Sequence, residues 1–407
     1  MDIVRTKTSY NDRFKTIMNK YKLFFLFFIL FLFTNCTQKT EKTENEKTQK
    51  TLLKKEEISK QNFNRKSYPE FIKGMYLNAY TIASKKLQPI LDQAKKTGIN
   101  TVVFDLKDMN GNIFLKISYQ DTMRQRRVLP IIDVEKTVAK LHDNKMRAVA
   151  RIVMFHDRFL AQNDPTLRPK KIDNSVWQES NKGKPSWLDS SNPEVQKELL
   201  ELIEKVAQTN IDEIQMDYVR FPTQGNINEA FFYFQKEDQE TALKDSLYVF
   251  RQKSDIIEDI IYRAKKICLK YDVKLTGDVF AIVAWQSKKD VANTGQDIKR
   301  MTKHLDAIHP MIYSSHFADN FAYRENAHNE PFYLMYKGTK LTRKNSNKMC
   351  KVIPYIQANN WEVNYKPEYI YAQIKAIESC PADGFILWDA SNNYLETLKW
   401  IEVFYSK

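Results

Sequence analysis

Glycine, histidine and cysteine are all scarce in this chain of 407 residues. The two glycines nearest in sequence are Gly98 and Gly111, so neither G-x-G-x-x-G nor G-x-x-x-x-G-K can occur. These motifs mark the two common nucleotide sites, and we expect neither. The six histidines and four cysteines form no C-x-x-C, H-x-x-x-H or H-E-x-x-H spacing. Zinc sites use such clustered ligands, so we predict no metal ion and no cofactor.

The chain also lacks a dense basic stripe. Its net charge is +14, and residues 1–70 contribute +7 of this, from 15 Lys/Arg against 8 Asp/Glu. Nucleic-acid-binding proteins usually gather their positive charge on one surface. A mildly basic, solvated surface is the simpler interpretation here, so we predict no nucleic-acid partner.

A long apolar run near the N-terminus predicts an export signal. Eleven Leu, Ile and Phe residues occupy positions 23–33, behind Lys15, Lys20 and Lys22. A basic region before an apolar core of this length is typical of a signal peptide, and the core is too short to span a bilayer. Cys36 follows closely, as the lipidated cysteine does in bacterial lipoproteins. We expect residues 1–36 to be a signal peptide ending at an acylated Cys36; an uncleaved anchor helix is the alternative.

The next segment predicts a flexible tether. Residues 37–66 are rich in Thr, Lys, Glu, Gln and Asn, and such a composition cannot bury enough apolar surface to fold. Residues 67–407 then form the folded domain. We expect this domain to be exported to the bacterial cell envelope and held at a membrane by the lipid.

Residues from 71 onward alternate between short β-rich runs and longer amphipathic runs, which predicts a parallel sheet covered by helices. The expected strands are 72–78, 100–106, 147–155, 212–218, 273–280, 305–313, 351–357 and 383–389. Eight strands alternating with helices predict an α/β fold, the (β/α)8 or TIM barrel. A doubly wound open sheet is the runner-up, and it lacks the glycine-rich first turn expected there.

Long insertions follow four of these strands, at 107–132, 156–191, 221–250 and 314–348. All four leave the C-terminal ends of strands, the face on which barrel enzymes build active sites. Five tryptophans are expected on this side: Trp177, Trp187, Trp285, Trp361 and Trp388. Their flat rings could hold sugar rings, or they could only pack the long loops.

Charged residues end several expected strands on the side that faces the barrel axis. Because side chains alternate along a strand, Gln215 and Asp217 share the inner face of 212–218. The rim residues expected to face the axis are Asp105, Arg151, Asp217, Asp278 and Asp389. A glycoside hydrolase needs two such carboxyls, one to protonate the leaving oxygen and one to attack or to activate water. The alternative is a set of salt bridges that closes the barrel top through Arg151 and Arg220.

Several segments carry a family resemblance as a set. They are 187–189, 213–222, 277–280, 294–296, 306–316 and 384–388. Together they resemble the glycoside hydrolase-like family first catalogued as bacterial domain of unknown function 4015. The resemblance runs from Lys73 to Tyr394, and it implies a TIM barrel related to polysaccharide hydrolases. Asp389 departs from it, because this family more often has asparagine after the tryptophan at that point.

These observations lead to assigned roles. We predict Asp217 as nucleophile or charge stabiliser, kept ionised by Arg220, and Asp278 as general acid/base, kept protonated by an apolar setting. Asp105 and Asp389 are reserves for the acid role. The residues expected to bind substrate are Asp105, Arg151, Tyr218, Arg220, Trp285, Tyr313, His316, Trp361, Trp388 and Asp389.

The predicted function is hydrolysis of an extracellular or cell-envelope polysaccharide or oligosaccharide. Two alternatives stay open: a catalytically inactive carbohydrate-binding lipoprotein on the same barrel, and a scaffold lipoprotein without enzyme activity. The hydrolase and the binding protein differ in whether Asp217 and a second carboxyl face one cleft, and the scaffold predicts no pocket at the rim.

The remaining cysteines predict one disulfide. Cys350 and Cys380 precede the strands at 351–357 and 383–389, which are neighbours in a closed barrel. Neighbouring strands lie about 5 Å apart, within the range that a disulfide spans. An exported domain meets an oxidising compartment, so we expect a Cys350–Cys380 bridge. Cys268 is expected to be an inert buried thiol.

Overall fold

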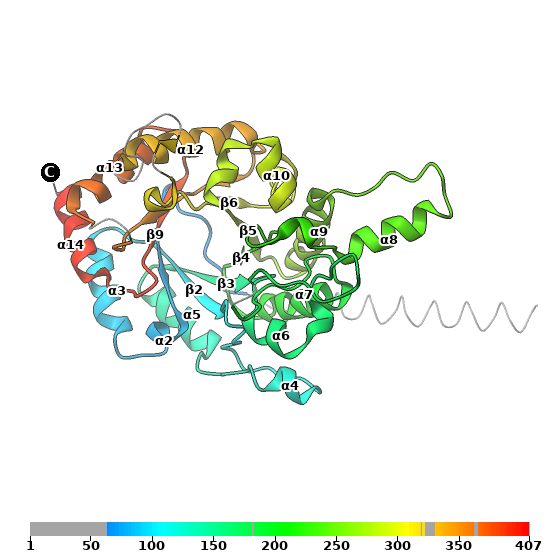
Figure 1. Cartoon of the computed structure of the whole chain (residues 1–407). Helices are drawn as coiled ribbons and strands as arrows, with labels where there is room; N and C mark the ends of the chain where they lie inside the picture. The colour runs from blue at the N-terminus through cyan, green and yellow to red at the C-terminus, as the bar shows by residue number, and fades with distance from the viewer. Residues whose placement is uncertain (1–62, 181–182, 319, 322–329, 362–364, 407) are drawn as a thin grey trace, which may run out of the picture. The chain divides into compact units, whose positions relative to one another are not determined.

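The computed structural model describes residues 63–180, 183–318, 320–321, 330–361 and 365–406 (Figure 1). The expected signal peptide, Cys36 and nearly all of the expected tether lie outside these residues. In the part of the chain that is described, no helix is long and apolar enough to cross a membrane.

Parallel strands form one curled sheet around a common axis. In chain order they are β1 (Ile72–Leu77), β2 (Thr101–Lys107), β3 (Arg147–Val153), β4 (Glu213–Asp217), β5 (Lys274–Val279), β6 (Ala307–Pro310), β7 (Lys351–Val352), β8 (Tyr355–Gln357) and β9 (Gly384–Trp388). Their order in the sheet is β7-β6-β5-β4-β3-β2-β1-β9-β8. Each predicted strand is present, and the one expected at 351–357 is divided into β7 and β8.

The divided strand closes the barrel. β7 pairs with β6, and β8 pairs with β9. Between them, Ile353 N donates to Ile308 O (3.0 Å), while Pro354 O accepts from Ile386 N (3.0 Å). Proline has no N–H to continue the ladder, which explains the division at this point. β7 and β8 are therefore one extended segment between β6 and β9, and the predicted (β/α)8 barrel is confirmed.

The helices lie outside the curled sheet, most of them against it, while the helices at 122–125 and 233–242 project away from it (Figure 1). They are α2 (Ala79–Ile82), α3 (Leu87–Lys96), α4 (Thr122–Gln125), α5 (Val134–Asp143), α6 (Arg158–Asn163), α7 (Pro193–Ala207), α8 (Tyr233–Ala242), α9 (Lys253–Lys270), α10 (Lys288–Thr294), α11 (Ile298–Met301), α12 (Pro331–Asn345), α13 (Pro367–Glu378) and α14 (Tyr394–Tyr405). The insertion expected at 314–348 is shorter than predicted, because its residues 331–345 form the covering helix α12.

Helix α7 shows how the sequence sets these elements. The Asn192 side chain accepts from the N–H groups of Glu194 and Val195, and Pro193 occupies the first turn, where no N–H is needed. Its buried face includes Leu199 and Ile203, at helical spacing. The helix thereby covers the sheet beside β4.

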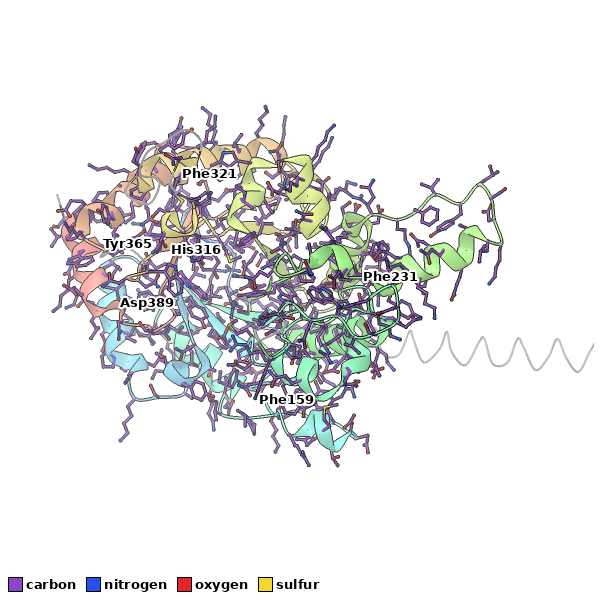
Figure 2. All side chains as sticks on the ribbon, in the orientation of Figure 1. Phe159, Phe231, His316, Phe321, Tyr365 and Asp389 are labelled. Carbon is purple, nitrogen blue, oxygen red and sulfur yellow. The ribbon has the colours of Figure 1, made fainter. Side chains whose placement is uncertain are left out.

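Apolar side chains fill the barrel interior below the C-terminal rim. The cluster comprises Ile72, Tyr76, Val103, Val149, Ala307, Tyr313, Ile353, Tyr355 and Ile386. Side chains also fill the space between the ribbons elsewhere in the molecule (Figure 2). At the other end of the axis, Arg147 Nη2 pairs with Glu213 (3.1 Å). The barrel interior is therefore packed with side chains, and the rim residues lie above this packed layer.

Barrel closure depends on a glycine at the start of β9. Gly384 pairs with Ile72 of β1, and its φ of +147° leaves no room for a side chain. A Cβ there would lie 2.1 Å from Ile72 O. We expect Gly384→Ala to lower the free energy of unfolding by about 2–3 kcal/mol through strain and overpacking.

Denaturant unfolding measures this loss. Gly183→Ala is the matched control, because the nearest atom to its added Cβ is 3.4 Å away, on the Ser180 side chain. Equal stability of the two variants would contradict the tight β1–β9 contact.

Candidate active site

A cleft of about 400 Å³ opens at the C-terminal ends of the strands, a volume within the range of small-molecule sites. Nine of the residues predicted from sequence line it: Asp105, Arg151, Asp217, Tyr218, Arg220, Asp278, Tyr313, His316 and Trp388. Its other lining residues are Tyr76, Asn78, Tyr80, Asp108, Met109, Asn110, Phe280, Gln296, Met311 and Ala390. The structure therefore brings most of the predicted site together.

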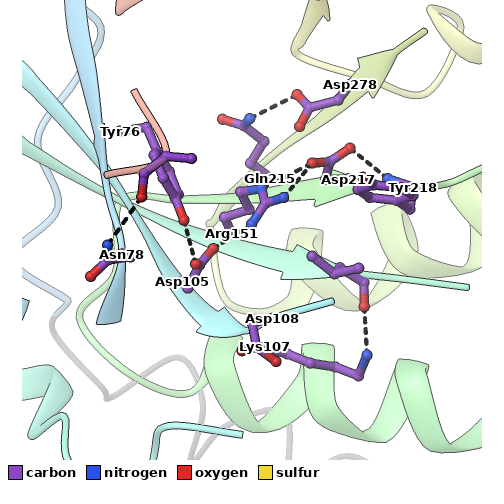
Figure 3. A network of polar contacts seen from close by, with 12 residues as sticks. Tyr76, Asn78, Asp105, Lys107, Asp108, Arg151, Gln215, Asp217, Tyr218 and Asp278 are labelled. Carbon is purple, nitrogen blue, oxygen red and sulfur yellow. Dashed lines mark hydrogen bonds and ion pairs between the residues drawn. The ribbon is translucent and has the colours of Figure 1, made fainter. Parts of the chain in front are cut away.

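Asp217 ends β4 and is held at both carboxylate oxygens (Figure 3). Arg151 donates to Oδ2 from Nη2 (2.6 Å) and from Nε (3.0 Å). Tyr218 N donates to Oδ1 (2.6 Å). Tyr218 has a φ of +52°, a left-handed conformation that a non-glycine residue adopts at some cost. These three donors hold the Asp217 carboxylate in one orientation.

Arg151 joins two acids of the rim. Its Nη1 donates to Asp105 Oδ1, and Tyr76 Oη donates to Asp105 Oδ2 (2.6 Å). Burial raises the pKa of Asp105, and the contacts with Arg151 and Tyr76 oppose that shift. Arg151 lies on β3, directly beside β4. The ion-pair partner of Asp217 is therefore Arg151. Arg220, which was expected in that role from the sequence, makes no described ion pair with Asp217, although the charge of Asp217 opposes the lowering of the Arg220 pKa by burial.

Asp278 on β5 is the second carboxyl of the cleft. Gln215 Nε2 donates to its Oδ1 (2.7 Å), whereas Oδ2 is buried and has no hydrogen-bond partner. Burial, together with the negative charge of Asp217, raises the pKa of Asp278 well above its ordinary value. A carboxyl whose pKa is raised thus lies in the same cleft as a carboxyl that is paired with an arginine, and glycoside cleavage by acid catalysis uses two carboxyls in such different surroundings.

Gln215 positions this acid. Strand alternation predicted that the Gln215 side chain faces the barrel axis, but no role for it followed from the sequence. Its side chain is fully buried between Asp217 and Glu213 in the alternating face of β4. Nε2 also donates to Tyr355 Oη (2.6 Å). The amide therefore ties Asp278 to the side chain of β8 on the far side of the barrel.

Aromatic rings form one wall of the cleft. Trp388 stacks on Tyr76 with ring centroids 4.2 Å apart, and it lies 6.2 Å from Tyr313 in a similar orientation. Tyr76 was missed in the sequence, although it lies on the inner face of the first predicted strand. Flat rings of this kind suit the C–H faces of sugars.

Three predicted binding residues lie outside the residues that line this cleft. Trp285 packs edge-on against Phe317 (5.2 Å) and Phe321 (5.0 Å) in the loop after β6. Trp361 is 53% exposed and meets only the edge of the His316 ring at 6.2 Å among the described aromatic contacts.

Asp389 is the third of these, and its assigned role is corrected. Its Oδ1 accepts from Ser391 N (2.8 Å) and Ser391 Oγ (2.6 Å), and its Oδ2 accepts from Asn393 N (2.8 Å). Trp388 faces the cleft, so the following residue points away from it. Asp389 shapes the turn before α14 and cannot serve as the reserve acid.

The predicted disulfide is absent. Cys268, Cys350 and Cys380 are all free thiols. Cys350 Sγ donates to Lys351 O, and Cys380 Sγ donates back to Ile377 O of α13. The two side chains follow their own turns, although the strands after them are close. Among the described residues, no group of three or more His, Cys, Asp or Glu could hold a metal ion.

Comparisons with known proteins agree with this geometry. A family model described as "Putative glycosyl hydrolase domain" matches residues 74–394. A search of curated proteins finds no match.

Solved structures share the fold. The PgaB (BpsB) glycoside hydrolase domain from Bordetella bronchiseptica is 13% identical, with a TM-score of 0.57 over 81% of this chain and 98% of that one. The alpha-L-fucosidase isoenzyme 2 from Paenibacillus thiaminolyticus is also 13% identical, with a TM-score of 0.54 over 82% of this chain and 49% of that one. The beta-galactosidase from Marinomonas ef1 is 10% identical, with a TM-score of 0.54 over 78% and 54%. At these identities the likeness extends to the fold alone.

Proposed function

The chain belongs to the "Putative glycosyl hydrolase domain" family, and we propose that it hydrolyses glycosidic bonds of a polysaccharide or oligosaccharide. One observation carries the proposal: the Asp278 carboxyl lies in the same cleft as the ion-paired Asp217, and its Oδ2 is buried without a hydrogen-bond partner. The pKa of this carboxyl is raised by burial. A carboxyl with a purely structural role usually has hydrogen-bond partners for both of its oxygens.

The chemistry follows from these two carboxyls. Asp278 gives its proton to the glycosidic oxygen as the bond from that oxygen to the sugar carbon breaks. Asp217 then either attacks the carbon to form a glycosyl ester, which water cleaves in a second step, or stabilises the positive charge while water attacks. In both cases the deprotonated Asp278 takes the proton from that water and is restored. Trp388 and Tyr76 offer a platform for the sugar ring.

One observation favours a silent carbohydrate-binding protein instead. Arg151 and Tyr218 N occupy both oxygens of Asp217, as they would in a purely structural ion pair. In that case the aromatic wall would still bind glycans, and no bond would be cleaved.

Incubating the purified protein with a panel of defined polysaccharides separates the two. New reducing ends that disappear with Asp278→Asn support the hydrolase. Binding to a glycan without any new reducing ends supports the silent protein. If the protein neither cleaves nor binds any glycan of the panel, both candidate functions are excluded.

We also propose that the domain is exported and anchored at the cell envelope through Cys36, because this cysteine follows the apolar run at 23–33. Fatty-acid labelling of cells that make the wild type or Cys36→Ala measures this. Equal labelling of the two proteins would contradict it.

A further inference from the structure

One cation of the cleft has no carboxylate partner among the described residues. Arg220 is 8% exposed and lines the cleft. Only its Nη1 is engaged, by Phe221 O (3.0 Å) and Thr223 Oγ1 (3.4 Å). Nε and Nη2 donate to no described acceptor. They are also not fully buried, since they are absent from the set of buried polar atoms without a partner. Two adjacent N–H donors of the guanidinium are therefore left for something in the cavity.

Aromatic faces hold this guanidinium in place. Its carbon lies 4.6 Å from the centre of the Trp187 ring and 4.9 Å from that of Phe280. Burial lowers the pKa of Arg220 to about 10, so the side chain is still charged at neutral pH. Taking a cation out of water without an anion is unfavourable. An anionic group on a bound ligand would supply the counter-charge that the buried Arg220 lacks.

The other charges at the cleft floor are already matched. Asp105 and Asp217 share Arg151. Asp108 accepts four hydrogen bonds, two from Asn110 and two from Asn112. Burial lowers the pKa of Arg220 and the charge of Asp217 opposes this shift, but no carboxylate among the described residues forms an ion pair with this guanidinium.

The rim beside Arg220 adds positive charge. Arg158 is exposed, donates from Nη1 to Asn110 Oδ1 (3.2 Å), and has no carboxylate partner among the described residues. Burial lowers the pKa of the nearby His156 to about 4, with Arg158 and Arg220 acting in the same direction, so His156 is neutral. Arg158 and Arg220 are therefore two cations on this side of the cleft without a carboxylate ion pair among the described residues.

We propose that Arg220 binds an anionic group of the substrate, and that the substrate is therefore an acidic glycan. The inference rests on the proposed function, since it names the substrate class for the same cleft. The paired Nε and Nη2 donors match a planar carboxylate, as in a uronic acid unit. A sulfate or phosphate ester would share the charge without the planar match.

Paired substrates test this directly. Polygalacturonate, alginate and hyaluronan are each compared with their carboxyl-reduced neutral forms, and dextran sulfate serves as the sulfate arm. We expect one uronic acid polymer to be cleaved, with kcat/KM about 10- to 100-fold lower after carboxyl reduction, as when a charge-assisted contact is lost.

Arg220→Gln should lower kcat/KM by about the same factor on the acidic polymer and have a much smaller effect on the reduced one, because the two changes remove the same contact. Arg220→Lys should recover only part of the loss, since it keeps the charge and not the paired donors. Arg126→Gln, on an exposed arginine outside the cleft, controls for net charge. Thermal unfolding checks that each variant is folded.

Four outcomes separate the inference from the proposed function. Cleavage of neutral polymers that is insensitive to Arg220→Gln overturns the inference and keeps the hydrolase. Arg220-dependent binding of an acidic polymer without cleavage keeps the inference as a binding site and overturns the hydrolase. Preference for dextran sulfate overturns the carboxylate assignment. No binding and no cleavage anywhere in the panel overturns both.

Discussion

Replacing Asp278 by asparagine should lower turnover of a cleaved glycan by about 10²- to 10⁴-fold, the usual contribution of a general acid. Asparagine keeps an oxygen for the Gln215 amide and has no proton to give to a leaving group. Asp217→Asn should be similarly damaging, because it removes the charge that Arg151 holds in the cleft. Initial rates of reducing-end release measure both effects.

The raised pKa of Asp278 also predicts the pH dependence. Activity requires its proton, so kcat/KM should fall as pH rises through the pKa of Asp278 in the free enzyme. The folded protein holds this proton more tightly than the unfolded chain does, where an aspartate titrates near 4. Wild-type stability should therefore decrease as pH rises above about 4 until Asp278 ionises, and this slope should be absent in Asp278→Asn.

Urea unfolding across this pH range makes the comparison. At neutral pH the asparagine variant should be at least as stable as the wild type, while its activity is nearly lost. Asp259→Asn, on a half-exposed acid of α9, is the control and should change neither. A variant at Asp278 that loses stability and retains activity would show that this carboxyl is structural.

Arg151→Met should lower the free energy of unfolding by about 3–5 kcal/mol at neutral pH, the usual effect of removing one partner from a buried ion pair. Methionine fills a similar volume and leaves Asp105 and Asp217 buried without their cation. The loss should shrink at low pH, because protonation removes the two unpaired charges.

Chemical unfolding at two pH values tests this. Arg263→Met breaks a partly exposed pair with Asp259 and should cost no more than about 1 kcal/mol. If Arg151→Met fails to fold, adding Asp217→Asn should restore part of the stability, since one stranded charge is then gone. A loss no larger than that of the control would show that Arg151 does not hold the rim together.

Much of the barrel could be predicted because its rules are local. Strand alternation placed Asp217 and Asp278 on the inner face of neighbouring strands, and the structure has them in one cleft. The position of each strand followed from runs of β-branched and aromatic residues. The division at Pro354 could have been read from the missing N–H, and it was not.

The contacts of the site depend on geometry that the sequence does not display. Tyr218 turns left-handed after β4, so the chain leaves the barrel and carries Arg220 onto Trp187, away from Asp217. Arg151 lies four residues after the start of β3. Its side chain is long enough to reach Asp217 on the neighbouring strand. Asp389 was misplaced by one step of alternation, because Trp388 is the residue that faces inward.

Barrel closure brings together residues that are synthesised at the start and at the end of the domain. Asn78 N and Asn392 Oδ1 are hydrogen-bonded across 314 positions of sequence, beside the β1–β9 pair. Such distant contacts form late in folding. The two carboxyls come from the middle of the chain, whereas the stacked pair of Tyr76 and Trp388 joins its two ends. A chain cut short before β9 would keep both acids and lack the platform on which a sugar could rest, so only a completed chain can present a working cleft.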